Sequence, residues 1–240
     1  SGSQFVVVGT AAATTVTITP TDAIAAHAAG VSYTVTLNAG QTYLGRAAAG
    51  TADLTGTLIT SDQPVAVFAG NRCGNVPTGI NACDTLLEQL VPTNTWGEKF
   101  LTVPYANRTN GDRFRAMASS NGTQITINGG APINLNRGQF YEFVLTTAGN
   151  IQSNPGHPIQ LMQYEHSRRF DTPILVNDPS MAIVYPYEQY LLDYTISTPT
   201  NTGFDPAVFA SAYNYVNITA PVAAVGSVTV DGIAVPQNQW

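Results

Sequence analysis

The amino-acid sequence predicts an all-β fold that consists of two related antiparallel β-sandwich-like modules. Three observations carry this prediction: polar and apolar residues alternate along most segments, turn dipeptides separate those segments, and parts of the chain repeat. Alternation with a period of two places successive side chains on opposite faces of a strand. Short strands separated by frequent turns are typical of antiparallel sandwiches and barrels.

The first half of the chain alternates from its beginning and is rich in Val, Ile and Thr. These residues favour strands because a branched side chain packs well on a pleated surface. We expect strands at residues 5–9, 14–20, 32–40, 56–61 and 64–70. Residues 22–30 are rich in Ala but long enough for only a turn or two of helix, and residues 84–90 are expected to form one further helical turn.

Asn-Gly and Asp-Gly dipeptides divide the second half, because these residues adopt the positive φ angles that tight hairpins need. The dipeptides lie at residues 110–111, 121–122, 128–129 and 231–232. We expect strands at residues 99–104, 123–130, 139–145, 158–164, 182–186, 194–198, 213–220 and 227–232. A further strand follows Gly111, and in it Arg113 and Arg115 share one face.

The chain also matches itself, which indicates an internal duplication. Residues 37–43 (LNAGQTY) match 135–141 (LNRGQFY), 59–68 match 151–162, and 124–129 (QITING) match 227–232 (SVTVDG). The separations predict modules of about 100 residues each. We expect residues 1–3 to be a remnant of cloning, 4–120 to form the first module, 121–224 to form the second, and 225–240 to begin a further hairpin, either truncated or closing the first module.

Charge and hydropathy exclude two classes of partner. Charged residues make up 10% of the sequence and the net charge is −6, whereas binding to nucleic acid needs clustered Lys and Arg. No apolar stretch approaches the roughly 18 residues that cross a bilayer as a helix. We therefore expect no nucleic-acid partner and no membrane insertion.

The two cysteines, Cys73 and Cys83, bracket a segment with two glycines and a proline. A disulfide between them is the favoured interpretation, and two buried free thiols are the alternative. A zinc site needs four ligands, but the sequence has no second cysteine pair and its three histidines are scattered, so we expect no metal and no cofactor. A disulfide indicates an oxidising compartment, outside the cell or at its surface.

Basic residues gather around Asp112. Arg108, Arg113 and Arg115 lie within a few positions of it. We expect Asp112 to form a partly buried ion pair with Arg108 or Arg115 that fixes the corner between the modules. An anion or sialic-acid site built on these arginines is the alternative.

The sequence contains no Gly-x-Ser-x-Gly elbow, Walker loop, His-Glu-x-x-His motif or dinucleotide-binding fingerprint. The nearest arrangement is Glu165, His166 and Asp171, in which a carboxylate could orient a histidine as a general base. Adjacent residues on a strand point to opposite faces, however, so Glu165 and His166 do not converge if this segment is extended. We therefore expect a protein that is not an enzyme, and a hydrolase remains a weaker alternative.

Tyrosines form the most promising binding surface. A tyrosine offers both stacking area and a hydroxyl group, which suits sugars or a protein epitope. The expected ligand-binding residues are Tyr185, Tyr187, Tyr190, Tyr194, Arg168 and Arg169. The alternative is that the tyrosines pack one module against the other. Three glycosylation sequons begin at Asn107, Asn121 and Asn217.

The central part of the chain resembles the IgGFc-binding-protein N-terminal domain family, including bacterial members of the adhesin type. The resemblance rests on Gly70, Asn71, Cys73, Val76, Pro77, Ala82, Cys83, Asp84, Leu86, Glu88, Gln89, Pro92, Trp96, Gly97, Phe100, Arg108, Gly111, Asp112 and Arg115. It extends from about Phe5 to the end of the chain. It implies an extracellular, disulfide-containing β-domain of a larger secreted or surface protein, and it supplies no catalytic residues.

These observations predict a non-enzymatic adhesive or recognition domain. Its expected partner is a glycan or a protein on another cell or on a matrix. A second hypothesis is a structural spacer or self-assembling fibre module, whose partners are identical subunits, so a homo-oligomer is one expected form.

Overall fold

The computed structural model describes residues 2–80, 82–106, 108–168, 170, 178–197 and 216–239. The chain divides into two compact units, one from Ser1 to Tyr190 and the other from Leu191 to Trp240. The first unit holds two β-sandwiches, and the fold is all-β as the sequence predicted. None of the helices in the described part of the chain is long and apolar enough to cross a membrane.

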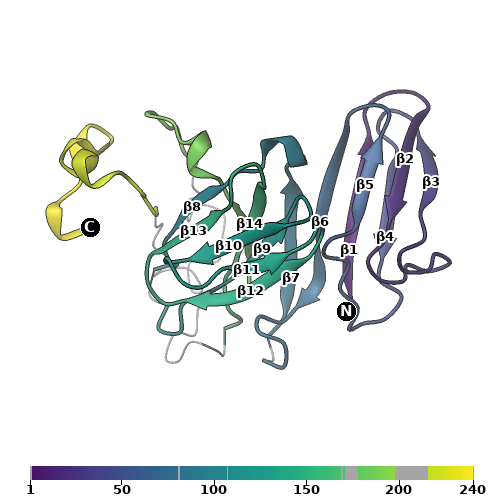
Figure 1. Cartoon of the computed structure of the whole chain (residues 1–240), viewed down its shortest axis with the longest axis horizontal. Helices are drawn as coiled ribbons and strands as arrows, with labels where there is room; N and C mark the ends of the chain where they lie inside the picture. Colours follow the sequence, from purple (N-terminus) through teal and green to yellow (C-terminus); the bar gives the residue numbers. More distant parts are fainter. Residues whose placement is uncertain are drawn as a thin grey trace, which may run out of the picture. The chain divides into compact units, whose positions relative to one another are not determined.

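The first sandwich consists of one four-stranded and one three-stranded antiparallel sheet (Figure 1). The larger sheet has the order β4-β1-β6-β7, with β4 at Thr42–Arg46, β1 at Ser3–Gly9, β6 at Val65–Gly74 and β7 at Asp84–Leu90. The smaller sheet has the order β3-β2-β5, with β3 at Tyr33–Leu37, β2 at Thr14–Thr19 and β5 at Leu58–Ser61. Alternate residues of the strands, including Phe5, Val7, Val16 and Ile18, are buried in a shared core.

The second sandwich consists of two four-stranded antiparallel sheets. One has the order β12-β9-β14-β15, with β12 at Phe140–Leu145, β9 at Asp112–Ala118, β14 at Ile159–Tyr164 and β15 at Met181–Val184. The other has the order β11-β10-β13-β8, with β11 at Ile133–Leu135, β10 at Thr123–Ile127, β13 at Gly149–Ser153 and β8 at Lys99–Thr102. Phe100, Phe114, Ile125, Ile151 and Leu161 form the centre of its core.

The strand order confirms the internal duplication. The order β4-β1-β6-β7 recurs as β12-β9-β14-β15, and β3-β2-β5 recurs as β11-β10-β13. The repeated LNxGQ segment forms the same turn twice. The side-chain oxygen of Gln41 accepts a hydrogen bond from the Asn38 backbone at 2.8 Å, and Gln139 accepts one from Asn136 at 2.8 Å. The duplication is therefore visible in sequence, topology and turn geometry.

Strands β8 and β9 lie before residue 120, where the first module was expected to end. They pair with β13, β12 and β14 of the second sandwich. The self-match covered only parts of each module. It therefore could not show at which residue the strands stop pairing within the first sandwich and begin to pair within the second. The exact limits of the modules stay a prediction.

Three local predictions were wrong or cannot be followed. Residues 84–90 form strand β7, because their backbone groups pair with β6, and a helical turn there would leave β6 without that partner. The strand expected at 194–198 is absent over 194–197, and 216–220, the described part of the strand expected at 213–220, is irregular. The positions 198 and 213–215 lie outside the described residues.

Helical structure is limited to short 3₁₀ segments in the described residues. These are η1 at Thr93–Thr95, η2 at Tyr187–Gln189, η3 at Val222–Ser227 and η4 at Gln237–Gln239. In the second unit the predicted hairpin around Asp231-Gly232 is present, formed by β16 at Thr229–Val230 and β17 at Ile233–Ala234.

Candidate functional site

A cleft with a volume of about 630 Å³ lies between the two sandwiches of the first unit. One wall is the outer face of the sheet β12-β9-β14-β15, and the opposite wall comes from β1, β6 and β7. Residues 50–57, between β4 and β5, and residues 73–78, at the end of β6, complete the rim. A cavity of this size is within the usual range of ligand sites.

Strand alternation determines which side chains enter the cleft. In β9 the residues Phe114, Ala116 and Ala118 are buried in the core of the second sandwich. Arg113, Arg115 and Met117 alternate with them and line the cleft instead. The same alternation on β14 sends Ile159 and Leu161 into the core and leaves Gln160, Met162 and Tyr164 on the cleft face.

The register of the strands arranges these side chains in rows across the sheet. Glu142 of β12 lies opposite Arg115, which lies opposite Met162. In the next row Phe140 lies opposite Met117, and Met117 lies opposite Gln160. In the first of these rows the charged side chains lie on β12 and β9, and the apolar one lies on β14.

All three methionines of the chain line this one cleft. Met117, Met162 and Met181 come from three neighbouring strands. Leu86 and Leu90 of β7 also line the cleft, from the first sandwich. Methionine side chains are flexible and polarizable, and they are frequent at surfaces that accept differently shaped apolar groups.

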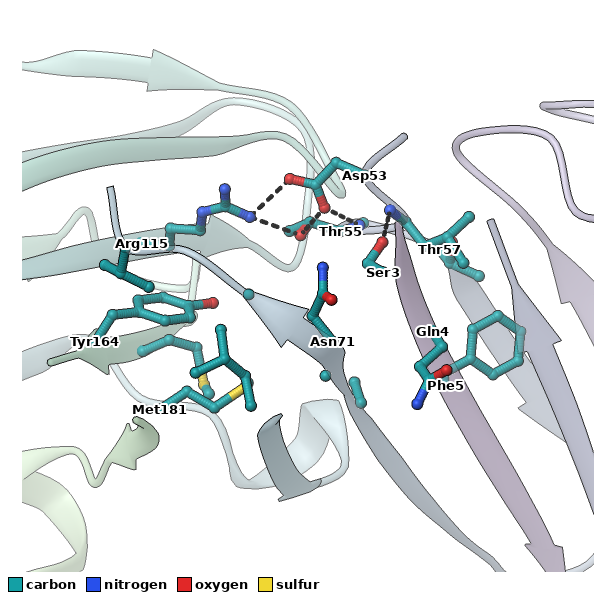
Figure 2. A pocket seen from close by; sticks show the side chains of 18 of the residues that line it. Ser3, Gln4, Phe5, Asp53, Thr55, Thr57, Asn71, Arg115, Tyr164 and Met181 are labelled. Atoms are coloured by element: carbon teal, nitrogen blue, oxygen red, sulfur yellow. Dashed lines mark hydrogen bonds and ion pairs between the residues drawn. The ribbon is translucent and has the colours of Figure 1, made fainter. Parts of the chain in front are cut away.

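Arg115 connects the two walls of the cleft. Its Nη1 atom lies 2.7 Å from Asp53 Oδ2 and 3.0 Å from Thr55 Oγ1, both in the segment 50–57. Its Nε atom donates to Glu142 Oε2 at 2.8 Å, and Arg113 pairs with the other oxygen of Glu142. Figure 2 shows Arg115 reaching toward Asp53 and Thr55, above Tyr164. The cationic groups of the cleft are thus held by carboxylates of both sandwiches.

The electrostatics of this group follow from burial and pairing. Burial raises the pKa of Asp53, but the charge of Arg115 and hydrogen bonds from Thr55 outweigh it and hold that pKa below its usual value. Burial likewise raises the pKa of Glu142, and Arg115 and Arg113 together bring it below the usual value. The pKa of Tyr164 is raised, chiefly by burial, although Arg115 opposes the shift. Both carboxyl groups are ionised at neutral pH and the tyrosine is neutral.

Close backbone contacts position the segment that carries Asp53. Ser3 Oγ accepts a hydrogen bond from the Leu54 backbone at 2.6 Å. Gly56 has a φ of +89°, and a Cβ atom there would overlap the carbonyl oxygen of Gly138 in the β11–β12 turn. Only glycine satisfies both the backbone angle and the close approach.

The predicted disulfide is present. Cys73 and Cys83 are bonded, with a distance of 4.9 Å between their Cα atoms. The loop that they close contacts the second sandwich through reciprocal bonds. The Val76 backbone donates to Ser167 Oγ at 2.9 Å, and the Ser167 backbone donates to the Val76 carbonyl at 2.6 Å. The disulfide therefore constrains a loop that forms part of the cleft rim.

The predicted arginine cluster is divided between two places. Arg108 pairs with Glu165, and Arg115 lies in the cleft with Asp53 and Glu142. Asp112 is fully buried, and its Oδ2 atom accepts hydrogen bonds from the Tyr105 backbone at 2.6 Å and from Gln163 Nε2 at 2.8 Å. The expected pair between Asp112 and an arginine stays a prediction.

The predicted tyrosine surface is only partly assembled. Tyr185 is 56% exposed and Tyr187 is 39% exposed, with Lys99 Nζ 4.5 Å from the centre of the Tyr187 ring. Tyr190 is half-buried and packs against Tyr187 at 5.3 Å between ring centres. Tyr194 is exposed and belongs to the second unit. Of the two arginines expected beside them, Arg168 is exposed and Arg169 lies outside the described residues.

The residues behind the hydrolase alternative have other contacts. Glu165 pairs with Arg108 and accepts a hydrogen bond from Ser180 Oγ at 3.0 Å. His166 is fully buried, with its ring 4.4 Å from that of Phe170. Asp171 lies outside the described residues. Groups of three or more metal-ligating side chains are absent from the part of the chain that the structure describes.

Sequence reasoning did not identify the cleft. The sequence did indicate that Arg113 and Arg115 share a strand face, but Asp53 and Glu142 carried no local signal. They lie far from Arg115 in the sequence, and only the docking of one sandwich on the other brings Asp53 near. Of the three methionines, only Met162 lies on a strand expected for the second module, so the sequence did not group them.

Comparison with known proteins gives one family and one curated relative. The chain matches the family described as IgGFc binding protein over residues 1–240. It is 25% identical to a human protein named IgGFc-binding protein, over 89% of this chain and 4% of that relative. The chain therefore spans a small fraction of the length of that relative. No solved structure matches the chain.

Proposed function

Because the chain belongs to the IgGFc-binding protein family, we propose that it is an extracellular recognition domain that binds a protein partner in the cleft between its sandwiches. The name of the human relative refers to a protein ligand, the Fc part of immunoglobulin G. For this chain we propose only the class of ligand, a protein, and not that particular one.

The observation that carries the proposal is the composition of the cleft. It combines three methionines and two leucines with a polar group centred on Arg115. Protein interfaces are typically built in this way, from an apolar centre with a few oriented polar groups, and Met and Arg are enriched in them. The charged groups pair with one another, an arrangement that suits binding better than proton transfer.

The disulfide supports an extracellular location. Disulfides persist in oxidising compartments and are rare in the cytosol, and the Cys73–Cys83 bond fits such a compartment. The bond also constrains the loop at the cleft rim, so the cleft is shaped before a partner arrives. Such preorganisation lowers the entropic cost of binding.

The proposal is tested by filling the cleft from its rim. Thr78 is exposed and lines the cleft, so Thr78→Trp should obstruct it without disturbing a core. The full chain is immobilised and its binding to purified secreted proteins, including immunoglobulin G Fc and a mucin, is measured by surface plasmon resonance. We expect at least one protein to bind the unmodified chain and to bind Thr78→Trp at least about tenfold more weakly.

Thr36→Trp is the matched control, because Thr36 is exposed on β3 and does not line the cleft. This variant should bind as the unmodified chain does. Equal binding by Thr78→Trp and the unmodified chain would contradict the proposal, and so would a chain that binds none of the proteins tested.

A second candidate function is glycan binding at the exposed tyrosines. The exposed rings of Tyr185 and Tyr187, with Lys99 above the latter, favour it, since sugars stack on tyrosine rings. A glycan array would separate the two functions. Loss of glycan binding in Tyr187→Ala, with no loss in Thr78→Trp, would favour the tyrosine site over the cleft.

A further inference from the structure

We propose that the cleft binds an extended peptide segment of the partner, and that Gln160 donates a hydrogen bond to a main-chain carbonyl while the methionines enclose an apolar side chain. This inference rests on the proposed function and specifies the ligand of the same cleft. It assigns Gln160 a specificity role that the family match does not supply.

The first observation is the environment of Gln160. This residue is only 5% exposed, lines the cleft, and lies opposite Met117 on the neighbouring strand. Its Nε2 atom is buried without a hydrogen-bond partner among the described residues. A buried amide without a partner destabilises the folded protein, because it has lost its hydrogen bonds to water. A ligand that supplies an acceptor oxygen, after rotation of the side-chain amide, recovers part of that cost.

A second donor lies at the other end of the same wall. Arg113 lines the cleft, and its Nε atom is also buried without a partner in the described part of the chain. Arg113 precedes Met117 by four positions on β9, and Gln160 lies beside Met117. At about 3.3 Å per residue, the two donors are roughly 13 Å apart along the strand.

This spacing selects the class of ligand. A single sugar or a lone side chain is too short to meet both donors, whereas an extended peptide of about four residues spans roughly 13 Å. Each residue of such a peptide carries a carbonyl oxygen, so acceptors occur along its whole length. The two donors therefore match the repeating acceptors of a main chain.

The apolar part of the cleft supplies the side-chain pocket. Met162 lies opposite Arg115, between Gln160 and Arg113 along the wall. Met181 is on β15 and lies opposite Tyr164 of β14. Leu86 and Leu90 complete this part from the other sandwich. An unbranched or γ-branched apolar side chain, such as Met or Leu, fits thioether walls that can adjust their rotamers. A charged side chain there would lose its hydration without a partner.

The test uses linear peptides selected from a phage-displayed random library on the immobilised full chain. The selected peptides are synthesised, and their affinities for the unmodified chain and for Gln160→Met are measured by calorimetry. Met has a similar volume to Gln and no donor. We expect about a five- to tenfold loss of affinity, the usual effect of one hydrogen bond.

The stability of the unliganded protein gives an independent readout. Gln160→Met removes a buried amide that lacks a partner, so its free energy of unfolding should be equal to or higher than that of the unmodified chain. Weaker binding with unchanged or greater stability supports the inference. Weaker binding together with lost stability would instead mark Gln160 as a structural residue and overturn it.

Gln152→Met is the control, because Gln152 is exposed on β13 and does not line the cleft. Its affinity for the peptides should be unchanged. The outcomes separate the two proposals. If Thr78→Trp no longer binds the peptides but Gln160→Met binds them with unchanged affinity, this inference is overturned and the cleft remains the binding site. Binding that neither variant weakens would overturn both.

Discussion

Arg115 shows how one side chain joins two sandwiches. Its guanidinium contacts Asp53 and Thr55 from the first sandwich and Glu142 from the second. The planar fork of arginine can hold two carboxylates at once, whereas a lysine offers a single charged point. The side chain is also 4.6 Å from the ring centre of Phe140, which adds a cation–π contact.

The same group predicts how stability depends on pH. The pKa values of Asp53 and Glu142 are lower in the folded protein than usual. As the pH falls, these two carboxylates therefore bind protons in the unfolded chain at a higher pH than in the folded protein. Their contribution is complete above about pH 5 and is lost as the pH falls through the lowered pKa values. Because the carboxylates are partly exposed, we expect about 1 kcal/mol or less.

Urea titrations at a series of acidic pH values measure this contribution. Asp53→Asn should flatten the loss of stability at low pH, and Asp53→Asn with Glu142→Gln should flatten it further. Asp193→Asn changes an exposed carboxylate of the second unit and should leave the profile as it was. An unchanged profile in the double variant would show that the cleft pairs do not stabilise the fold.

Among the elements, β7 and the loop before it show best what sequence can and cannot predict. Alternation predicted most strands because it reports the two faces of a strand directly. It did not identify β7, in which Leu86 and Leu87 are adjacent and point to opposite faces. The close cysteines predicted the disulfide, since a short loop closes easily. Nothing local predicted that this loop would contact Ser167 and form a cleft rim.

Removing the disulfide should therefore affect both stability and binding. For Cys73→Ser with Cys83→Ser, the chain-entropy model predicts a free energy of unfolding lower by about 3 kcal/mol for a loop of this length. Chemical denaturation measures the change. Dithiothreitol should shift the midpoint of the unmodified chain toward that of the double variant and leave the double variant unaffected. If the unmodified chain and the double variant had the same midpoint, each with and without dithiothreitol, the disulfide would not stabilise the fold.

For the molecule as a whole, the duplicated sandwiches share contacts that neither could form alone. Arg115 pairs with Asp53, Val76 bonds with Ser167, and Gly56 lies against Gly138. The self-match of the sequence predicted two modules. Aligning the two copies shows which residues correspond, but it does not show which residues of one copy contact the other. The cleft could not be predicted for this reason, because it exists only where the two copies meet.

Because of these shared contacts, we expect a substitution that destabilises one core to destabilise the other sandwich as well. Phe114 is fully buried in the second core, and Phe114→Ala should lower the free energy of unfolding by about 3–5 kcal/mol. Hydrogen–deuterium exchange should then quicken in β1 of the first sandwich as well as in β9. Ile233→Ala, at an exposed site of the second unit, should leave the exchange rates of both β1 and β9 unchanged. If exchange in β1 stays constant while β9 opens, the sandwiches unfold independently, and a cleft between them would not be rigid enough to select one extended peptide over another.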